Sequence, residues 1–550
     1  MPHGSEITRR TFLELGAGAG LAAAAGVSCR AAAPAPTRNG RPTPILPFEL
    51  EEATIADLQE GMGRGRYSAR SLCEYYLGRI EDLDQRGPAL RSVIETNPDA
   101  LDIAEQLDAE RRARGPRGPL HGIPVLIKDN IATADRMATT AGSLALVGAK
   151  PPADAFVARK LHDAGAVIIG KTNLSEWANF RSSTSSSGWS ARGGQCLNPY
   201  VLDRSPCGSS SGTGAAIAAN FAAAGVGTET DGSIVCPSAA CSLVGIKPTM
   251  GVVSRTGIVP IAHSQDVAGP MARTVRDAAV LLAALAGEDP GDPATAAAPA
   301  PVTDYTPFLD PNGLKGARIG IARTKLFGYH AATDGLVDQA IDVMRRLGAV
   351  IVDPADIPHL GEYEDAELTV LLYEFKADLT RYLADFAPGA PVKTLQQIIA
   401  FNEHHRDREM PYFGQDLFLK AQEKGPLTDQ AYLDALARCR KLARDEGLKA
   451  VLEQQRLDAL VAPTGNPAWP IDLVNGDHFL GGSSTPAAVA GFPHITVPAG
   501  YVFGLPVGVS FVGAPFSEPT LVKLTYAYEQ ATKRRRSPTF LPTADVGTGR

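Results

Sequence analysis

A lysine and two serines have the residue types and surroundings that could support nucleophilic catalysis. Lys128 ends the apolar run GIPVLIK, Ser209 lies in SPCGSSSGTG, and Ser233 lies in GTETDGSIVCPSA. A serine hydroxyl attacks a carbonyl efficiently when a base removes its proton, and a buried lysine can be that base because burial favours its neutral form. Each residue also has a structural explanation, since a strand-end lysine often extends into water and Gly and Ser are common in turns. The residue types alone leave both interpretations open.

Two further motifs could carry chemistry of a different kind. Residues 165–172, GAVIIGKT, match the phosphate-loop pattern literally, but Ala, Val and Ile favour a strand where a phosphate loop needs a flexible bend. We interpret this match as accidental. Residues 208–212, GSSSG, resemble a nucleophile elbow centred on Ser210, which would make the protein a Ser–His–Asp esterase. An elbow follows a strand, whereas the residues before this motif form a Pro-containing loop.

The elements that must position these residues alternate between helices and buried strands. Helical spacing of apolar residues covers residues 54–86 and 98–114. Short continuous apolar runs are typical of strands in a sheet covered on both faces, and they occur at 121–131, 166–173, 316–322, 348–353 and 457–463. This alternation predicts an α/β protein. We expect one domain over residues 50–545, with a charge-rich helical cap or insertion over residues 360–450.

The segments that hold Lys128, Ser209 and Ser233 together resemble the amidase signature family. The resemblance covers most of residues 50–540 and is densest at 121–131, 205–214 and 227–250. The segment GTETDGSIVCPSA, with IVPIAHSQDVAGPMART after it, is most similar to the peptide amidase branch. The resemblance implies a central mixed β-sheet covered by helices on both faces.

The resemblance also implies a Ser–cis-Ser–Lys triad and a role for each site residue. Ser233 would be the nucleophile, Ser209, joined to Gly208 by a cis peptide bond, would relay protons, and Lys128 would be the ultimate base. An oxyanion hole would be formed by the backbone N–H groups of Thr230, Asp231, Gly232 and Ser233. The chain departs from the family pattern at four positions without losing a reacting group: Cys207, Glu229, Asp231 and Val235.

The implied activity is hydrolysis of a carboxamide through an acyl-enzyme, without a cofactor. The peptide amidase branch suggests C-terminal peptide amides as substrates, with release of ammonia. Small aliphatic or aryl amides are the alternative substrates, and a subunit of an amidotransferase that passes ammonia to charged tRNA is an alternative function. A non-catalytic binding protein of the same fold would not need all three candidate residues.

The first 49 residues have the composition of a targeting segment and a linker. Residues 8–13, TRRTFL, followed by the Gly/Ala-rich stretch 15–27, predict a twin-arginine export signal over residues 1–33. The apolar stretch is shorter than the roughly 20 residues that cross a bilayer. Residues 34–49 then form a Pro/Ala-rich linker. We expect export to the periplasm or the medium, and a lipid anchor on Cys29 is disfavoured by Gly26.

Composition excludes several other classes of protein. The 550 residues carry a net charge of -7, which argues against a nucleic-acid-binding surface because such surfaces are usually basic. Seven cysteines are too sparse for a disulfide framework, and none has a partner at zinc-site spacing. The adjacent His404 and His405 lie in a charged helical stretch. We therefore predict no metal site.

Overall fold

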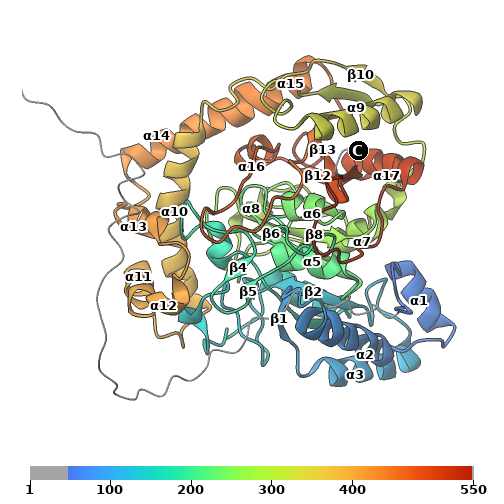
Figure 1. The fold of residues 1–550 in the computed structure, drawn as a ribbon, viewed down its shortest axis with the longest axis vertical. Helices are drawn as coiled ribbons and strands as arrows, with labels where there is room; N and C mark the ends of the chain where they lie inside the picture. The colour runs from blue at the N-terminus through green and yellow to red at the C-terminus, as the bar shows by residue number, and fades with distance from the viewer. Residues whose placement is uncertain (1–46, 548–550) are drawn as a thin grey trace, which may run out of the picture. The chain divides into compact units, whose positions relative to one another are not determined.

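An eleven-stranded mixed sheet runs through residues 47–547, the part of the chain that the computed structural model describes (Figure 1). Strand β2 pairs in parallel with its two neighbours, β3 and β6. The next four neighbouring pairs are antiparallel: β6 with β8, β8 with β7, β7 with β12, and β12 with β13. The predicted mixed sheet is thus confirmed. In spatial order the strands are β1 (Val93–Thr96), β3 (Val167–Thr172), β2 (Pro124–Lys128), β6 (Ala224–Glu229), β8 (Val267–Ala272), β7 (Val244–Lys247), β12 (His494–Val502), β13 (Leu505–Val512), β11 (Ala459–Pro463), β9 (Arg318–Ile321) and β10 (Val350–Val352).

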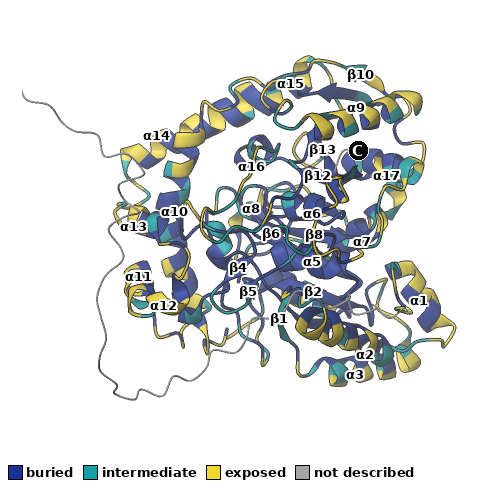
Figure 2. Ribbon diagram, in the orientation of Figure 1, coloured by how far each residue is buried: buried dark blue, intermediate teal, exposed yellow. Residues whose placement is uncertain are grey.

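Helices flank this sheet and bury its apolar residues, as Figure 2 shows by the dark core between exposed outer surfaces. Side-chain caps fix where several of them begin: the Thr54 hydroxyl accepts from the backbone N–H of Asp57, and the Thr274 hydroxyl accepts from that of Asp277. The flanking helices are α1 (Ile55–Gly63), α2 (Ala69–Arg79), α3 (Ala100–Arg114), α4 (Phe156–Asp163), α5 (Ser211–Ala218), α6 (Val235–Ala240), α7 (Val275–Leu285), α8 (Pro293–Ala296), α9 (Ala331–Arg346), α16 (Thr485–Ala490) and α17 (Glu518–Thr532).

The two strands beside the predicted lysine show why the competing phosphate-loop motif is accidental. Strand β2 consists of PVLIK and β3 of VIIGKT, and every residue of both is buried. Gly170 and Lys171 therefore lie inside a strand and pair with its neighbours, with Lys171 opposite Ile127. A phosphate loop needs these residues in a bend before a helix, and here they follow helix α4 instead.

Residues 364–454 form a helical layer that we call the helical wall. It contains α10 (Glu364–Asp385), α11 (Leu395–His404), α12 (Arg406–Glu409), α13 (Asp416–Gln422), α14 (Gln430–Cys439), the π-type segment η5 (Arg440–Leu448) and α15 (Lys449–Gln454). Phe375 and Phe418 stack at 5.1 Å, and Trp177 packs edge-on against Phe418, so the wall is joined to the loop after β3. Figure 1 shows α10 as a long helix beside the sheet layer.

The predicted export signal over residues 1–33 lies outside the described residues, which begin at residue 47. Nearly all of the predicted linker over 34–49 falls in the same undescribed segment. None of the helices in residues 47–547 has the length and apolarity needed to cross a bilayer.

Candidate active site

Lys128 lies at the end of β2 with its amine fully enclosed. Its Nζ is 2.8 Å from Oγ of Ser209, 2.9 Å from Oγ1 of Thr228 and 3.2 Å from the carbonyl oxygen of Thr228. Burial lowers the pKa of Lys128 to about 7, and the negative charges of Asp266 and Glu229 oppose that change. A substantial fraction of this lysine is therefore neutral at neutral pH, as a base must be.

Ser209 lies in the loop before α5 and is buried with the lysine. The Gly208–Ser209 peptide bond is cis, as the family resemblance implies. Neighbouring chain leaves no room at Gly208, where an added Cβ would overlap Oγ of Ser175 and lie 3.1 Å from Oγ of Ser187. The Ser209 carbonyl accepts from the backbone N–H of Ser175 at 3.1 Å. The loop is held from both sides, which fixes the hydroxyl against Lys128.

Ser233 lies in a tight turn between β6 and α6. Gly232 has φ +78°, a left-handed conformation that favours glycine, and the turn delivers Ser233 to the end of the sheet. Its carbonyl accepts from the backbone N–H of Ser210 at 3.2 Å, so the two serine-bearing segments are in direct contact. Ser233 is 7% exposed, while Lys128 and Ser209 are both at 0%. Of these three side chains, Ser233 is the one that a substrate can reach.

The turn before Ser233 also presents unpaired backbone donors. Within residues 47–547, the N–H groups of Thr230, Asp231, Gly232 and Ser233, the four residues predicted to form the oxyanion hole, have no hydrogen-bond acceptor. Successive free N–H groups around a left-handed glycine can bind a negatively charged oxygen. The Thr230 hydroxyl donates to Oδ1 of Asp266 at 2.6 Å, which fixes the start of the turn.

Glu229 holds the other side of this turn. Its Oε2 accepts from the backbone N–H of Ile234 at 2.7 Å and from that of Val235 at 3.0 Å. A carboxylate is favoured at a helix N-terminus, and here it binds the first residues of α6 directly after Ser233. Burial raises the pKa of Glu229, and nearby Lys247 acts against that shift. The side chain therefore fixes where the helix begins.

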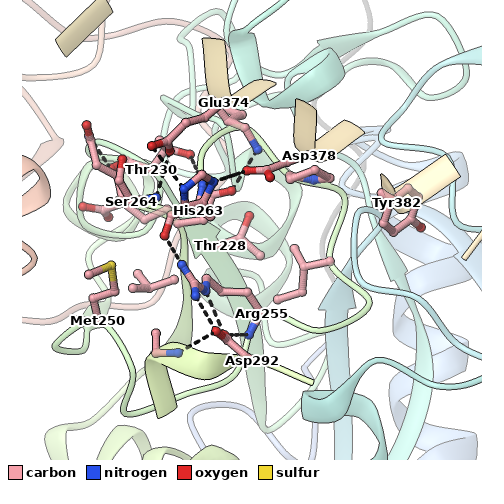
Figure 3. Close-up of a pocket in the computed structure, with 18 of the residues that line it drawn as sticks. Thr228, Thr230, Met250, Arg255, His263, Ser264, Asp292, Glu374, Asp378 and Tyr382 are labelled. Atoms are coloured by element: carbon pink, nitrogen blue, oxygen red, sulfur yellow. Dashed lines mark hydrogen bonds and ion pairs between the residues drawn. The ribbon is translucent and has the colours of Figure 1, made fainter. Parts of the chain in front are cut away.

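A cavity of about 760 Å³ is lined by Asn130, Thr228 and Thr230 and by residues of α10 and η5, whereas Lys128, Ser209 and Ser233 are not among its lining residues. Figure 3 shows Thr228 and Thr230 together with Glu374, Asp378 and Tyr382 of α10. Asn130 donates from Nδ2 to Oγ1 of Thr228 at 2.9 Å, and Thr228 in turn contacts Lys128. The cavity wall is thus joined directly to the lysine. Its volume is within the range of small-molecule sites.

The far wall of the cavity is charged. His263 donates from Nδ1 to Oδ2 of Asp378 at 2.7 Å, and its Nε2 lies 3.4 Å from Oε1 of Glu374 (Figure 3). Burial acts to lower the pKa of His263, but the hydrogen bond to Asp378 and the charge of Glu374 outweigh it and raise the pKa above its ordinary value. His263, Glu374 and Asp378 each have a potential metal-ligand atom, and these atoms lie within 4.8 Å of one another. A protonated His263 can itself supply the positive charge that balances the two carboxylates.

Sequence reasoning missed several residues of this site. Thr228, His263 and Glu374 have no local motif, and they meet through contacts between distant segments of the chain. A disulfide between Cys207 and Cys236 joins the Ser209 loop to helix α6, although the sparse cysteines gave no sign of a pairing. Ser210, the alternative nucleophile, is fully buried and donates its hydroxyl to the carbonyl oxygen of Thr228 at 3.0 Å.

Comparison with known proteins places the chain in a family. The family described as Amidase matches residues 71–522. The chain belongs to the amidase signature family. It is similar to the peptide amidase from Stenotrophomonas maltophilia, at 53% identity and a TM-score of 0.86, over 90% of this chain and 100% of that one. The amidase is thus a hydrolase acting on C–N bonds, similar to the bacterial peptide amidases.

Two curated relatives widen this comparison. A probable amidase of Arabidopsis thaliana, At4g34880, is 42% identical over 90% of this amidase and 93% of its own length. A glutamyl-tRNA(Gln) amidotransferase subunit from Chloroflexus aurantiacus is 37% identical over 88% of this amidase and 98% of its own length. The family therefore includes hydrolases and a subunit of an amidotransferase.

Proposed function

We propose that this amidase hydrolyses C-terminal peptide amides by a Ser–cis-Ser–Lys mechanism and releases ammonia. The observation that carries the proposal is the set of contacts around Lys128. A neutral amine has two N–H groups and one lone pair. If the two N–H groups donate to the carbonyl and hydroxyl oxygens of Thr228, the lone pair faces the hydroxyl of Ser209. That arrangement lets Lys128 accept a proton from Ser209.

The first half of the reaction forms an acyl-enzyme. Ser233 attacks the carbonyl carbon while its proton passes to Ser209, whose own proton passes to Lys128. The negative oxygen of the tetrahedral intermediate lies against the free N–H groups of Asp231, Gly232 and Ser233. The proton then returns through Ser209 to the amide nitrogen, the C–N bond breaks, and ammonia leaves.

The second half reverses these roles with water as the nucleophile. Ser209 takes a proton from the attacking water and passes one to Lys128; the proton on Lys128 then returns through Ser209 to Oγ of Ser233 as the acyl C–O bond breaks and the carboxylic acid leaves. Lys128 therefore gains and loses one proton in each half of the reaction. Its pKa of about 7 suits both transfers near neutral pH.

The cavity favours a substrate larger than a simple aliphatic amide. Its volume of about 760 Å³ exceeds what a two- or three-carbon acyl group would fill, and it carries both polar and charged side chains for an acyl part that contains peptide groups. The similarity to the peptide amidase of Stenotrophomonas maltophilia supports the same substrate class.

Ammonia release from peptide amides and propionamide, and arylamine release from an arylamide, test this function. We expect hydrolysis of N-acetyl dipeptide amides with kcat/KM at least about tenfold above that for propionamide or for an arylamide. Turnover of only the arylamide would replace the peptide-amide proposal with an aryl amidase. Glutaminase activity that appears only after co-purification with partner subunits would favour the amidotransferase function.

We further propose that residues 1–33 direct export by the twin-arginine route. The support is the paired Arg9 and Arg10 before a short apolar stretch. Replacing both arginines by lysine should keep the protein in the cytoplasm, as measured by cell fractionation. Unchanged export in that variant would contradict the proposal.

A further inference from the structure

A disulfide connects the two segments that carry the serines of the proposed mechanism. It joins Cys207, two residues before Ser209, to Cys236, three residues after Ser233, and the Cα atoms of the two cysteines are 6.0 Å apart. A covalent link this close to both hydroxyls limits how far one serine can move from the other, because each residue of chain extends by at most about 3.6 Å. Neither cysteine lines the cavity of about 760 Å³. The bond can therefore affect the serines without changing the cavity.

Each cysteine is attached firmly to the segment of its own serine. The carbonyl oxygen of Cys207 accepts from the hydroxyl of Ser211, the first residue of α5, at 2.6 Å. On the other side, the N–H of Cys236 donates to the carbonyl oxygen of Gly232 at 2.8 Å and so closes the chain around Ser233. A displacement of either sulfur is therefore transmitted to the neighbouring serine.

Hydrogen bonds between the two segments are few. In the described part of the chain, residues 205–211 and residues 230–236 share one direct hydrogen bond, which the N–H of Ser210 donates to the carbonyl oxygen of Ser233 at 3.2 Å. The hydroxyl of Ser209 is held separately by the lysine, 2.8 Å from its Nζ. The contact of Ser209 with the lysine therefore does not require the disulfide, whereas the spacing of the two serines depends on it.

We propose that the disulfide is a positioning element for the proton relay, and that the amidase turns over its substrate slowly when both thiols are free. The proposal rests on the proposed function, in which a proton passes from Ser233 to Ser209. A proton transfer needs its two oxygens within hydrogen-bond reach, and a misplacement of about 1 Å can slow a reaction about 100-fold. Loss of the cross-link lets the turn of Ser233 move away while the lysine keeps its contact with Ser209.

The same bond makes the activity sensitive to thiols. Dithiothreitol, a dithiol, gives two electrons and two protons to the disulfide, so that two free thiols form and the reagent becomes a cyclic disulfide. Oxidised glutathione reverses the step and leaves as two molecules of glutathione. Ala240 and Trp469 pack against the bond, but Cys236 is only half-buried and is the side from which a dithiol reaches it, since Cys207 is 6% exposed. Cytoplasmic thiols stay reduced, so the chain gains full activity only where disulfides form.

Reduction and reoxidation of the full chain test the proposal, with ammonia release from N-acetylphenylalaninamide as the readout. Well below the Tm of the reduced protein, we expect dithiothreitol to lower kcat about 10- to 100-fold and to change KM less than about threefold. Oxidised glutathione should restore kcat. The acidic limb of the pH profile should stay in place, because Lys128 keeps its contacts with Ser209 and Thr228.

Two pairs of substitutions show which sulfurs are responsible. Cys207→Ala with Cys236→Ala should have a kcat as low as that of the reduced protein, and dithiothreitol should not lower it further. Cys196→Ala with Cys241→Ala is the matched control, because it removes two buried free thiols and leaves the disulfide in place. This control should keep both the kcat of the unchanged amidase and its response to dithiothreitol.

The outcomes separate this inference from the proposed function. Equal kcat in the oxidised protein, the reduced protein and the variant without the disulfide would overturn the inference alone, because the bond would then add only stability. A fall in kcat that accompanies loss of the near-ultraviolet circular dichroism of the folded protein would also overturn it. Failure of the oxidised amidase to release ammonia from the amide would overturn both.

Discussion

The segments around Lys128, Ser209 and Ser233 and the far wall of the cavity are built in opposite ways. The core of the site, formed by the segments around Lys128, Ser209 and Ser233, is held by backbone atoms and small residues that leave no spare volume. The helical wall over residues 364–454 is held by side chains that pair with one another, such as Glu374 with Tyr432. The difference suggests that the core sets the chemistry and tolerates almost no change, whereas the wall sets the fit of the substrate and can be altered.

Variants of the core and of the helical wall should differ most in activity when the core variant lacks the proposed nucleophile. We expect Ser233→Ala to lower kcat about 10⁴-fold or more, as loss of a triad nucleophile does in serine hydrolases. Tyr432→Phe in the wall removes only the hydroxyl that donates to Glu374 at 2.8 Å, and should lower kcat/KM less than about tenfold. Ammonia release measures both. Substantial activity in Ser233→Ala would contradict the triad, and Ser210→Ala would then test the other serine.

A glycine-to-alanine change, which adds one methyl group, should lower the free energy of unfolding much more in the core than in the helical wall. In the core, a Cβ on Gly212 would overlap the carbonyl oxygens of Ser92 and Asn173 and lie 2.6 Å from the backbone N of Asn173. Backbone atoms cannot move aside cheaply, so Gly212→Ala should lower the free energy of unfolding by about 3 kcal/mol or more.

Gly389 in the wall is the matched position. An added Cβ there meets no atom within 4 Å, and Gly389→Ala should change the free energy of unfolding by less than about 0.5 kcal/mol. Chemical denaturation of both variants gives the comparison. Similar stability of the two alanine variants would show that the core is less rigid than its packing suggests.

The sequence was informative where the signal is local. Continuous apolar runs predicted β2, β3, β9, β10 and β11, because strands buried on both faces have few polar residues. It was uninformative for β6 and β8, whose sequences AGVGTE and VAGPMA carry neither alternation nor a long apolar run. Small residues in these strands leave space for α5 and the serine loops to pack against them. This packing depends on the assembled fold and cannot be seen in the local sequence.

The same contrast holds for the site residues. Family resemblance predicted roles for Lys128, Ser209 and Ser233, and the structure places Nζ of Lys128 2.8 Å from Oγ of Ser209, 81 positions away in the chain. Thr228 could not be found, because its role depends on an oxygen at hydrogen-bond distance from an amine 100 positions away. The pairing of His263 with Asp378 spans 115 positions and has no motif at all.

The disulfide cross-links two segments of the core, and its removal should lower the Tm of the protein. Cys207 and Cys236 are 29 positions apart and join the loop of Ser209 to the helix after Ser233. Removing a cross-link over such a span typically costs about 2–4 kcal/mol, so Cys207→Ala with Cys236→Ala should lower Tm measurably. Reducing agent should lower the Tm of the unchanged amidase and not that of the double variant. Cys196→Ala with Cys241→Ala, which removes two free buried thiols, should leave the response to reductant intact.

The smallest expected effect concerns the pH dependence of the base. Lys128 must be neutral to accept a proton, so kcat/KM should rise with pH through its pKa of about 7. The charge of Asp266 stabilises the ammonium form and raises that pKa. Asp266→Asn should therefore shift the acidic limb of the profile to lower pH, whatever it does to the maximum rate. Asp385→Asn, an exposed change on the cavity wall, should leave the limb where it is. An acidic limb that does not move to lower pH in Asp266→Asn would mean that it reports a group other than Lys128, which would contradict Lys128 as the base.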